Sequence, residues 1–142
     1  MSNEMLSIIA IVISIAGVLL SSLLYRNEIN NMKFSDSNEI FITLDQVMIQ
    51  YPETRPYFYD NQPIGKDLDS VERDRILLIA ELMLDAGEWI VDKHRGMGRK
   101  NEAAQKQYVL DCLCNSAVMR QHVSEHPTWH PHVAEIAREA KL

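Results

Sequence analysis

Hydrophobic residues form one uninterrupted segment near the N-terminus and are periodically spaced in the rest of the chain. Residues 5–24 read MLSIIAIVISIAGVLLSSLL, in which four serines are the most polar side chains and no side chain is charged. As an α-helix this segment would rise about 30 Å, which matches the hydrocarbon core of a bilayer. The pattern predicts a transmembrane anchor over residues 1–25.

A cleaved signal peptide is the alternative to an anchor. The residues before the hydrophobic segment are MSNE, which are acidic rather than basic. The segment also exceeds the roughly 7–15 residues of a signal-peptide core, and no A-x-A-like site follows it. Arg26 and Lys33 follow the segment, whereas Glu4 precedes it. The positive-inside rule therefore predicts a single-pass protein of the cell membrane with its C-terminal domain in the cytoplasm.

The chain after the anchor is predicted to be helical throughout. Residues 26–38, RNEINNMKFSDSN, are polar and are predicted to be a juxtamembrane linker, with Asp36 and Glu39 as a capping box that opens a helical domain over 39–142. Helical spacing of apolar residues predicts helices at about 38–51, 69–94, 102–114, 116–125 and 131–140. No useful two-residue alternation occurs. The predicted fold is all-α: one N-terminal transmembrane helix plus a small bundle of about four to five helices.

Local signals define where these helices begin and which sides they bury. Asp69 with Glu72, Asn101 and Ser116 are predicted N-caps, Gly96 is a predicted C-terminal stop, and Pro131 opens the last helix. The segment from Ile76 to Leu84 is apolar on nearly every side except Glu81, which predicts a central, buried helix. The inner stripe of the last helix is predicted to be Trp129, Val133, Ile136, Ala137 and Ala140.

Residues 51–65, YPETRPYFYDNQPIG, combine three prolines with four aromatic residues. So much aromatic area is rarely left in water, which predicts a structured loop. Its rings either fold back over the bundle or form a platform for a partner. The candidate partner-binding residues are Arg55, Tyr57, Phe58 and Tyr59.

Three segments resemble a group of uncharacterised bacterial proteins. These segments are PETRPYFYD at 52–60, IAELMLDAGEWI at 79–90 and the helix that opens after Asn115-Ser116. Proteins of that group are small, helical and often membrane-anchored, with a P-E-L-R-x-Y-F-Y-D-like segment. The similarity covers about residues 40–130 and departs from the pattern at Thr54, where the group has leucine, and at Ala117, where it has proline. Since the group has no assigned activity, the resemblance implies fold and anchoring and transfers no functional residue.

Four of the five histidines lie within eleven residues near the C-terminus. His122 to His126 match H-x-x-E-H, in which two histidines hold zinc and a glutamate acts as general base. Pro127 counts against this motif, because the residue before a proline is pushed out of the helical region. A broader hypothesis is a metal site formed by His122, His126, His130 and His132. The alternative is that these side chains pack and cap a turn between helices.

The net charge of −6 lies almost entirely after the anchor, since Glu4 is the only charged residue before residue 25. An acidic domain disfavours nucleic acid as a partner. One helix is predicted to carry an acidic stripe formed by Glu81, Asp85, Glu88 and Asp92. The stripe is either a solvated face or paired with Lys106 or Arg120. Glu81 has apolar neighbours and is therefore the candidate for an acid with a perturbed pKa.

The basic segment KHRGMGRK at 93–100 is predicted to be an exposed loop. Cys112 and Cys114 point apart on a helix, so they are not expected to form a disulfide.

These observations favour a membrane-tethered helical interaction module that recruits or senses a protein or lipid partner. The alternatives are a small metal-dependent enzyme that uses the histidine cluster, and a membrane-acting phage or defence effector. No catalytic residue and no cofactor is assigned, and an enzyme is the less favoured class.

Overall fold

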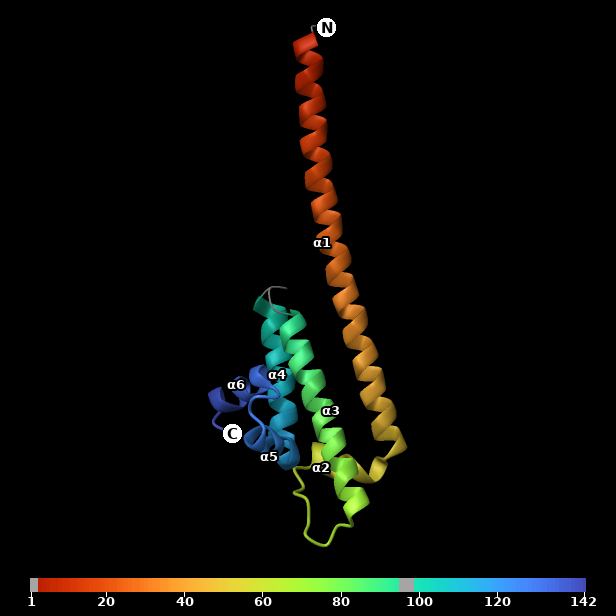
Figure 1. Cartoon of the computed structure of the whole chain (residues 1–142), viewed down its shortest axis with the longest axis vertical. Helices are drawn as coiled ribbons and strands as arrows, with labels where there is room; N and C mark the ends of the chain where they lie inside the picture. The colour runs from red at the N-terminus through yellow and green to blue at the C-terminus, as the bar shows by residue number, and fades with distance from the viewer. Residues whose placement is uncertain (1–2, 95–98) are drawn as a thin grey trace. The chain divides into compact units, whose positions relative to one another are not determined.

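The computed structural model describes residues 3–94 and 99–142 (Figure 1). These residues form six α-helices and one 3-10 turn and contain no strand, so the predicted all-α fold with a small helical bundle is confirmed. The chain divides into two compact units, one up to Asp36 and one from Ser37 to Leu142. The predicted C-terminal stop at Gly96 lies outside the described residues.

The first unit consists of the N-terminal part of helix α1 (Asn3–Gln50). Among the described residues, the stretch Ile11–Ile29 is long and apolar enough to cross a membrane, with a mean hydropathy of 1.3 and no part of it buried. Its large apolar side chains, among them Ile13, Val18 and Leu23, are exposed.

Helix α1 continues through the predicted linker at 26–38, where the sequence analysis expected a break. Asp36 and Glu39 therefore lie inside α1, and the predicted capping box at this position is wrong. The segment contains neither proline nor glycine, and its serines and asparagines cost a helix only up to about 0.7 kcal/mol each relative to alanine. Nothing in the local sequence is strong enough to end the helix before Pro52.

The second unit begins with the last turns of α1 and continues through six short elements. These are η1 (Pro52–Thr54), α2 (Arg55–Tyr59), α3 (Ser70–His94), α4 (Arg99–Asn115), α5 (Ala117–Glu125) and α6 (Pro131–Glu139). Two predicted caps are confirmed. The Asp69 carboxylate accepts a hydrogen bond from the backbone N–H of Glu72 at 2.9 Å, and the Ser116 hydroxyl accepts one from Met119 at 3.1 Å. Pro131 opens α6 as predicted, whereas α4 begins at Arg99, so Asn101 lies inside the first turn instead of capping it.

Helix α3 is the centre of the second unit, and it contacts α4, α5 and α6 (Figure 1). Ile76, Leu84 and Ile90 on this side are fully buried. Gly87 lies at this interface, where a Cβ atom would make ordinary contacts of 3.4 Å with a Val109 methyl and 3.5 Å with a Val133 methyl. The prediction that α3 is buried on nearly every side is wrong on one side, where Leu78 is 65% exposed.

Arg120 connects the loop after α2 to the end of α4 by hydrogen bonds. Its guanidinium donates hydrogen bonds to the carbonyl oxygens of Leu113 at 2.6 Å and Cys114 at 3.0 Å, and to the Asn61 side chain at 2.7 Å. Asn61 has a φ of 56°, a left-handed conformation that asparagine tolerates better than most residues. Arg120 therefore satisfies a helix C-terminus and is not the partner that the acidic stripe was expected to have.

Candidate functional site

The aromatic segment contributes mainly to the core. Tyr57 and Phe58 on α2 are 5% and 1% exposed and belong to the main hydrophobic cluster. The Ser116 hydroxyl donates a hydrogen bond to the carbonyl of Tyr57 at 2.8 Å, which fixes α2 against the start of α5. Of the four candidate partner-binding residues, Arg55 and Tyr59 remain on the surface, with the guanidinium 5.4 Å from the ring centroid. Tyr57 and Phe58 have the packing role.

The two cysteines have different surroundings and are both free thiols. Cys112 packs against the hydrophobic cluster beside Tyr108, whose ring makes an edge contact with Phe41 at 5.2 Å. Burial raises the pKa of the Cys112 thiol and of the Tyr108 hydroxyl. A thiol with a raised pKa holds little thiolate at neutral pH, so Cys112 is not suited to nucleophilic chemistry. Cys114 is exposed.

Three of the four clustered histidines have adjacent rings. The centroid of His122 lies 4.9 Å from that of His126 and 6.0 Å from that of His130. His126 stacks on Trp129 at 4.2 Å, and Trp129 is 54% exposed, so its predicted place on the inner stripe of α6 is wrong. Helix α5 ends at Glu125 and His126 has φ −129° and ψ 56°, so the H-x-x-E-H segment lacks the continuous helix that a zinc-protease motif needs.

The described residues contain no group of three or more histidine, cysteine, aspartate or glutamate side chains arranged to hold a metal ion. His132 is separated from the other rings by its own carboxylate contact, in which its Nδ1 lies 2.6 Å from Glu88 Oε1. The Nδ1 of His130 lies 3.4 Å from Asp85 Oδ1. These contacts direct the His130 and His132 rings toward two different carboxylates of α3.

Glu88 has a structural role that the sequence analysis missed. Its carboxylate accepts hydrogen bonds from the backbone N–H groups of His132 at 2.9 Å and Val133 at 3.0 Å. These are two of the four N–H groups that the first turn of a helix leaves without a partner. A carboxylate at this position also interacts favourably with the helix dipole. Glu88 is 44 residues from His132, so no local motif could have identified it as the cap of α6.

The histidine cluster is electrostatically unusual. Burial lowers the pKa of His122 below its ordinary value of 6.5, and the neighbouring His126 and His130 lower it further, while Glu81 and Glu125 act in the opposite direction. Glu81, the candidate acid, is half-buried on α3. The Nε2 of His122 and both ring nitrogens of His130 are buried and make no well-aligned hydrogen bond with any described residue. The His122 imidazole is therefore neutral at neutral pH.

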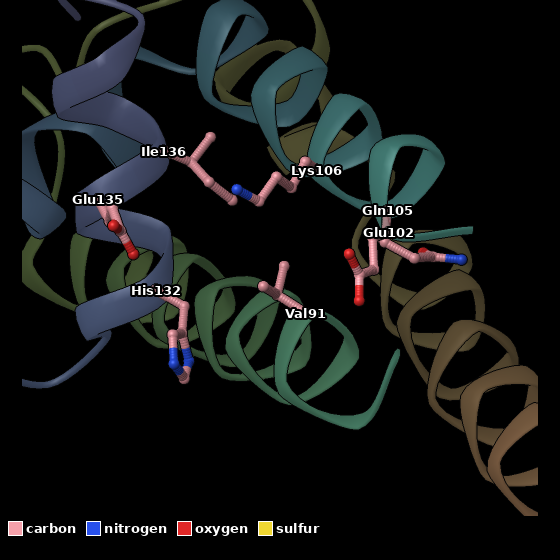
Figure 2. A pocket seen from close by; sticks show the side chains of 7 residues that line it. All are labelled: Val91, Glu102, Gln105, Lys106, His132, Glu135 and Ile136. Carbon is pink, nitrogen blue, oxygen red and sulfur yellow. The ribbon is translucent and has the colours of Figure 1, made fainter. Parts of the chain in front are cut away.

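A small cavity of about 210 Å³ lies between α3, α4 and α6 (Figure 2). It is lined by Val91, Glu102, Gln105, Lys106, His132, Glu135 and Ile136. Figure 2 shows that Glu102 and Gln105 come from α4, whereas His132 and Glu135 come from α6 on the other side. These lining residues include no serine, threonine or cysteine.

An open groove of about 470 Å³ runs along the opposite side of α3. It is lined by Tyr51, Val71, Asp74, Arg75, Leu78, Ile79 and Leu82. Val71 and Leu78 are each 65% exposed and Leu82 is 38% exposed. At 3.6 residues per turn, these three side chains lie on one stripe of the helix. We call this feature, defined by the seven lining residues, the α3 groove.

The end of the α3 groove is shaped by Arg75. Its guanidinium lies 4.6 Å from the centroid of the Tyr51 ring and donates a hydrogen bond to the Glu53 carboxylate at 3.2 Å. Both contacts hold Arg75 toward the start of η1. The apolar floor of the groove is left uncovered.

Comparison with known protein families, with curated proteins and with solved structures finds no match to this chain. The resemblance to the group of bacterial membrane-anchored proteins therefore stays a prediction.

Proposed function

We propose that this protein is a membrane-tethered interaction module that binds a protein partner in the α3 groove. The observation that carries the proposal is the exposure of Val71, Leu78 and Leu82 on one stripe of a helix whose side toward α4, α5 and α6 is buried. Burying one such side chain in an interface contributes about 1.5–3 kcal/mol. A contiguous exposed apolar patch is typical of a binding surface.

The N-terminal helix provides the tether in this proposal. The stretch 11–29 has a mean hydropathy of 1.3 and is not buried, and Arg26 and Lys33 follow the uncharged segment 5–24. We infer a single crossing of the cell membrane with the domain in the cytoplasm. A tether of this kind confines the groove to the membrane surface and raises the effective concentration of the module for partners located there.

The metal-dependent enzyme is not proposed, because no group of three or more potential ligands is arranged to hold a metal ion in the part of the chain that the structure describes. No contact in the described residues favours a membrane-acting effector over a module. The aromatic segment is replaced as the candidate platform by the α3 groove, since two of its three adjacent rings are buried.

The proposal is tested by photo-crosslinking from the groove in native membranes. A photoreactive amino acid is placed at position 78 of the full-length chain, and a second version carries it at position 49, which is 78% exposed on α1. We expect a discrete adduct from position 78 that is lost when Leu82→Gln is added, and no such adduct from position 49. Equal adducts from both positions, or none from position 78, would contradict the proposal.

The membrane tether is tested separately. Extraction with alkaline carbonate should leave the chain in the membrane fraction, and release into the supernatant would contradict the tether.

A further inference from the structure

We infer that the partner of the α3 groove is an amphipathic helix with lysine or arginine along one edge of its apolar face. This inference rests on the proposed function and adds the chemistry of the partner. It follows from the length of the groove, from the charged residues on either side of its apolar floor, and from the contacts that Arg75 and Lys93 already make within the chain.

The floor of the groove has the length and spacing of a helix-binding site. Val71, Leu78 and Leu82 occupy positions i, i+7 and i+11 of α3, which cover about 16 Å along the helix axis. Helix-in-groove recognition uses anchors at i, i+3 or i+4 and i+7 on the bound helix, so three turns of an amphipathic helix match this length. The groove is open along its side, which suits an elongated partner better than a small molecule.

Acidic residues lie along one side of the apolar stripe of α3. Asp74 lines the groove, and Asp85 and Asp92 continue this side of the helix beyond Leu82, the last lining residue, at about 300–320° around the helix when Val71 is placed at 0°. All three are exposed. Asp85 lies 3.4 Å from His130, whereas Asp74 and Asp92 make no ion pair within the part of the chain that the structure describes.

The opposite edge is basic, but its charges are already engaged. Arg75 contacts Tyr51 and Glu53, and the Lys93 ammonium lies 5.6 Å from the centroid of the Trp89 ring. A partner helix that extends from the groove along α3 therefore meets Asp74, Asp85 and Asp92 over about 27 Å. Complementary charges across an interface favour the correct partner and disfavour a like-charged one.

The same charges argue against two other occupants. An anionic membrane surface would be repelled by Asp74, Asp85 and Asp92. A second copy of the chain, held parallel by the shared membrane, would present Arg75 and Lys93 to this edge, and both cations are already engaged within their own chain. A basic amphipathic helix satisfies both the apolar floor and the acidic edge.

The test uses the full-length chain in nanodiscs of phosphatidylcholine, a zwitterionic lipid that does not itself attract basic peptides. The probes are two fluorescent 18-residue helical peptides with the same leucine stripe, one with lysines and one with glutamates along the flanking edge. Fluorescence anisotropy measures binding, with empty nanodiscs as the blank. We expect the lysine peptide to bind at least about tenfold more tightly than the glutamate peptide, and this preference to shrink at high salt.

Two variants locate the binding to the groove and to its edge. Leu78→Gln should weaken both peptides, whereas the matched control Ile49→Gln, which removes an equally exposed apolar side chain elsewhere, should not. The double variant Asp74→Lys/Asp92→Lys should reverse the peptide preference. Its control is Asp60→Lys/Glu139→Lys, which changes the net charge equally at exposed positions outside the groove and should keep the preference. All the substituted side chains are exposed, so these variants should fold.

The outcomes separate the inference from the proposed function. If both peptides bind equally and Leu78→Gln weakens both, the docking function stands and the basic partner is wrong. If neither peptide binds above empty nanodiscs, or Leu78→Gln changes nothing, both ideas fail. If light scattering shows a dimer that Leu78→Gln converts to a monomer, the occupant is a second copy. If the chain without peptide binds anionic vesicles through Leu78, the occupant is a membrane surface.

Discussion

The two sides of α3 differ in what covers them. On the side toward α4, α5 and α6, Ile76, Leu84 and Ile90 are fully buried, and even the Glu88 carboxylate is engaged as the cap of α6. On the side of the α3 groove, Val71 and Leu78 are two-thirds exposed. Both sides are apolar. One helix therefore carries more hydrophobic surface than its own domain can cover.

This difference separates stability from binding within a single helix. Buried apolar area stabilises the fold, because it is removed from water in the native state. Exposed apolar area contributes nothing to folding and becomes favourable only when a partner covers it. The comparison predicts that substitutions on the two sides of α3 will have different consequences, and each prediction below tests one part of that difference.

The largest expected effect is on the covered side. Leu84→Ala removes a fully buried side chain and leaves a cavity between α3 and its neighbours, so it should lower the free energy of unfolding by about 2–5 kcal/mol. Denaturant titration of the full-length chain in detergent micelles, followed by circular dichroism, measures this change. The matched substitution on the open side is Leu78→Ala, which should change the free energy by no more than about 0.5 kcal/mol. Equal losses for the two variants would mean that the chain itself covers the groove, and the comparison would fail.

Glu88 should give the next largest effect. Glu88→Gln keeps the shape of the side chain but removes the charge that faces the N-terminus of α6, so we expect a loss of about 1–2 kcal/mol. The same denaturant titration measures it. Asp92→Asn is the control on the exposed edge, and it should leave stability unchanged. If Glu88→Gln behaves like Asp92→Asn, the charge of the Glu88 carboxylate does not stabilise α6.

The features that sequence patterns predicted are those encoded within a few residues. The caps at Asp69 and Ser116 join residues three apart, and Pro131 acts through its own fixed backbone angle, so each leaves a local signal. Likewise, helical spacing is enough to place α3, α5 and α6. The continuation of α1 through 26–38 was missed because weak helix formers were taken to break a helix that has no strong breaker.

The features that were missed depend on contacts between distant residues. Glu88 caps α6 across 44 residues, and Arg120 reaches back to Asn61 across 59. The exposure of Leu78 is also non-local, because an apolar residue in a helix carries no signal of whether another element covers it. For the same reason, four nearby histidines suggested a metal site, whereas two of the rings, His130 and His132, contact different carboxylates of α3.

The covered side should also be sensitive to acid. Since the pKa of His122 is lower in the folded chain than its ordinary value of 6.5, the unfolded chain binds the proton more readily between the two values. The contribution of His122 to stability should therefore be fully present above pH 6.5 and be lost as the pH falls from 6.5 toward the folded value. Denaturation midpoints measured from pH 8 to pH 5 test this. His122→Gln should flatten the dependence, and an unchanged slope in that variant would assign the acid sensitivity to other groups.

The smallest expected effect on stability is at the end of the α3 groove. Arg75→Gln removes an ion pair with Glu53. The two side chains are 34% and 47% exposed, and exposed pairs of this kind contribute at most about 1 kcal/mol to stability. The loss of the contact with Tyr51 adds a similarly small term, of about 0.5–1 kcal/mol.

The same substitution should increase the affinity of the groove for the lysine-edged peptide. Without Arg75, the Glu53 carboxylate is no longer neutralised, and the groove becomes more acidic. The lysine-edged peptide should then bind more tightly to Arg75→Gln than to the parent chain, by a few-fold at low salt and with no gain at high salt. Glu53→Gln is the complementary variant. It leaves Arg75 without its carboxylate and should weaken the same peptide by a similar factor. If both variants shift binding in the same direction, the change reflects the shape of the groove and not its charge.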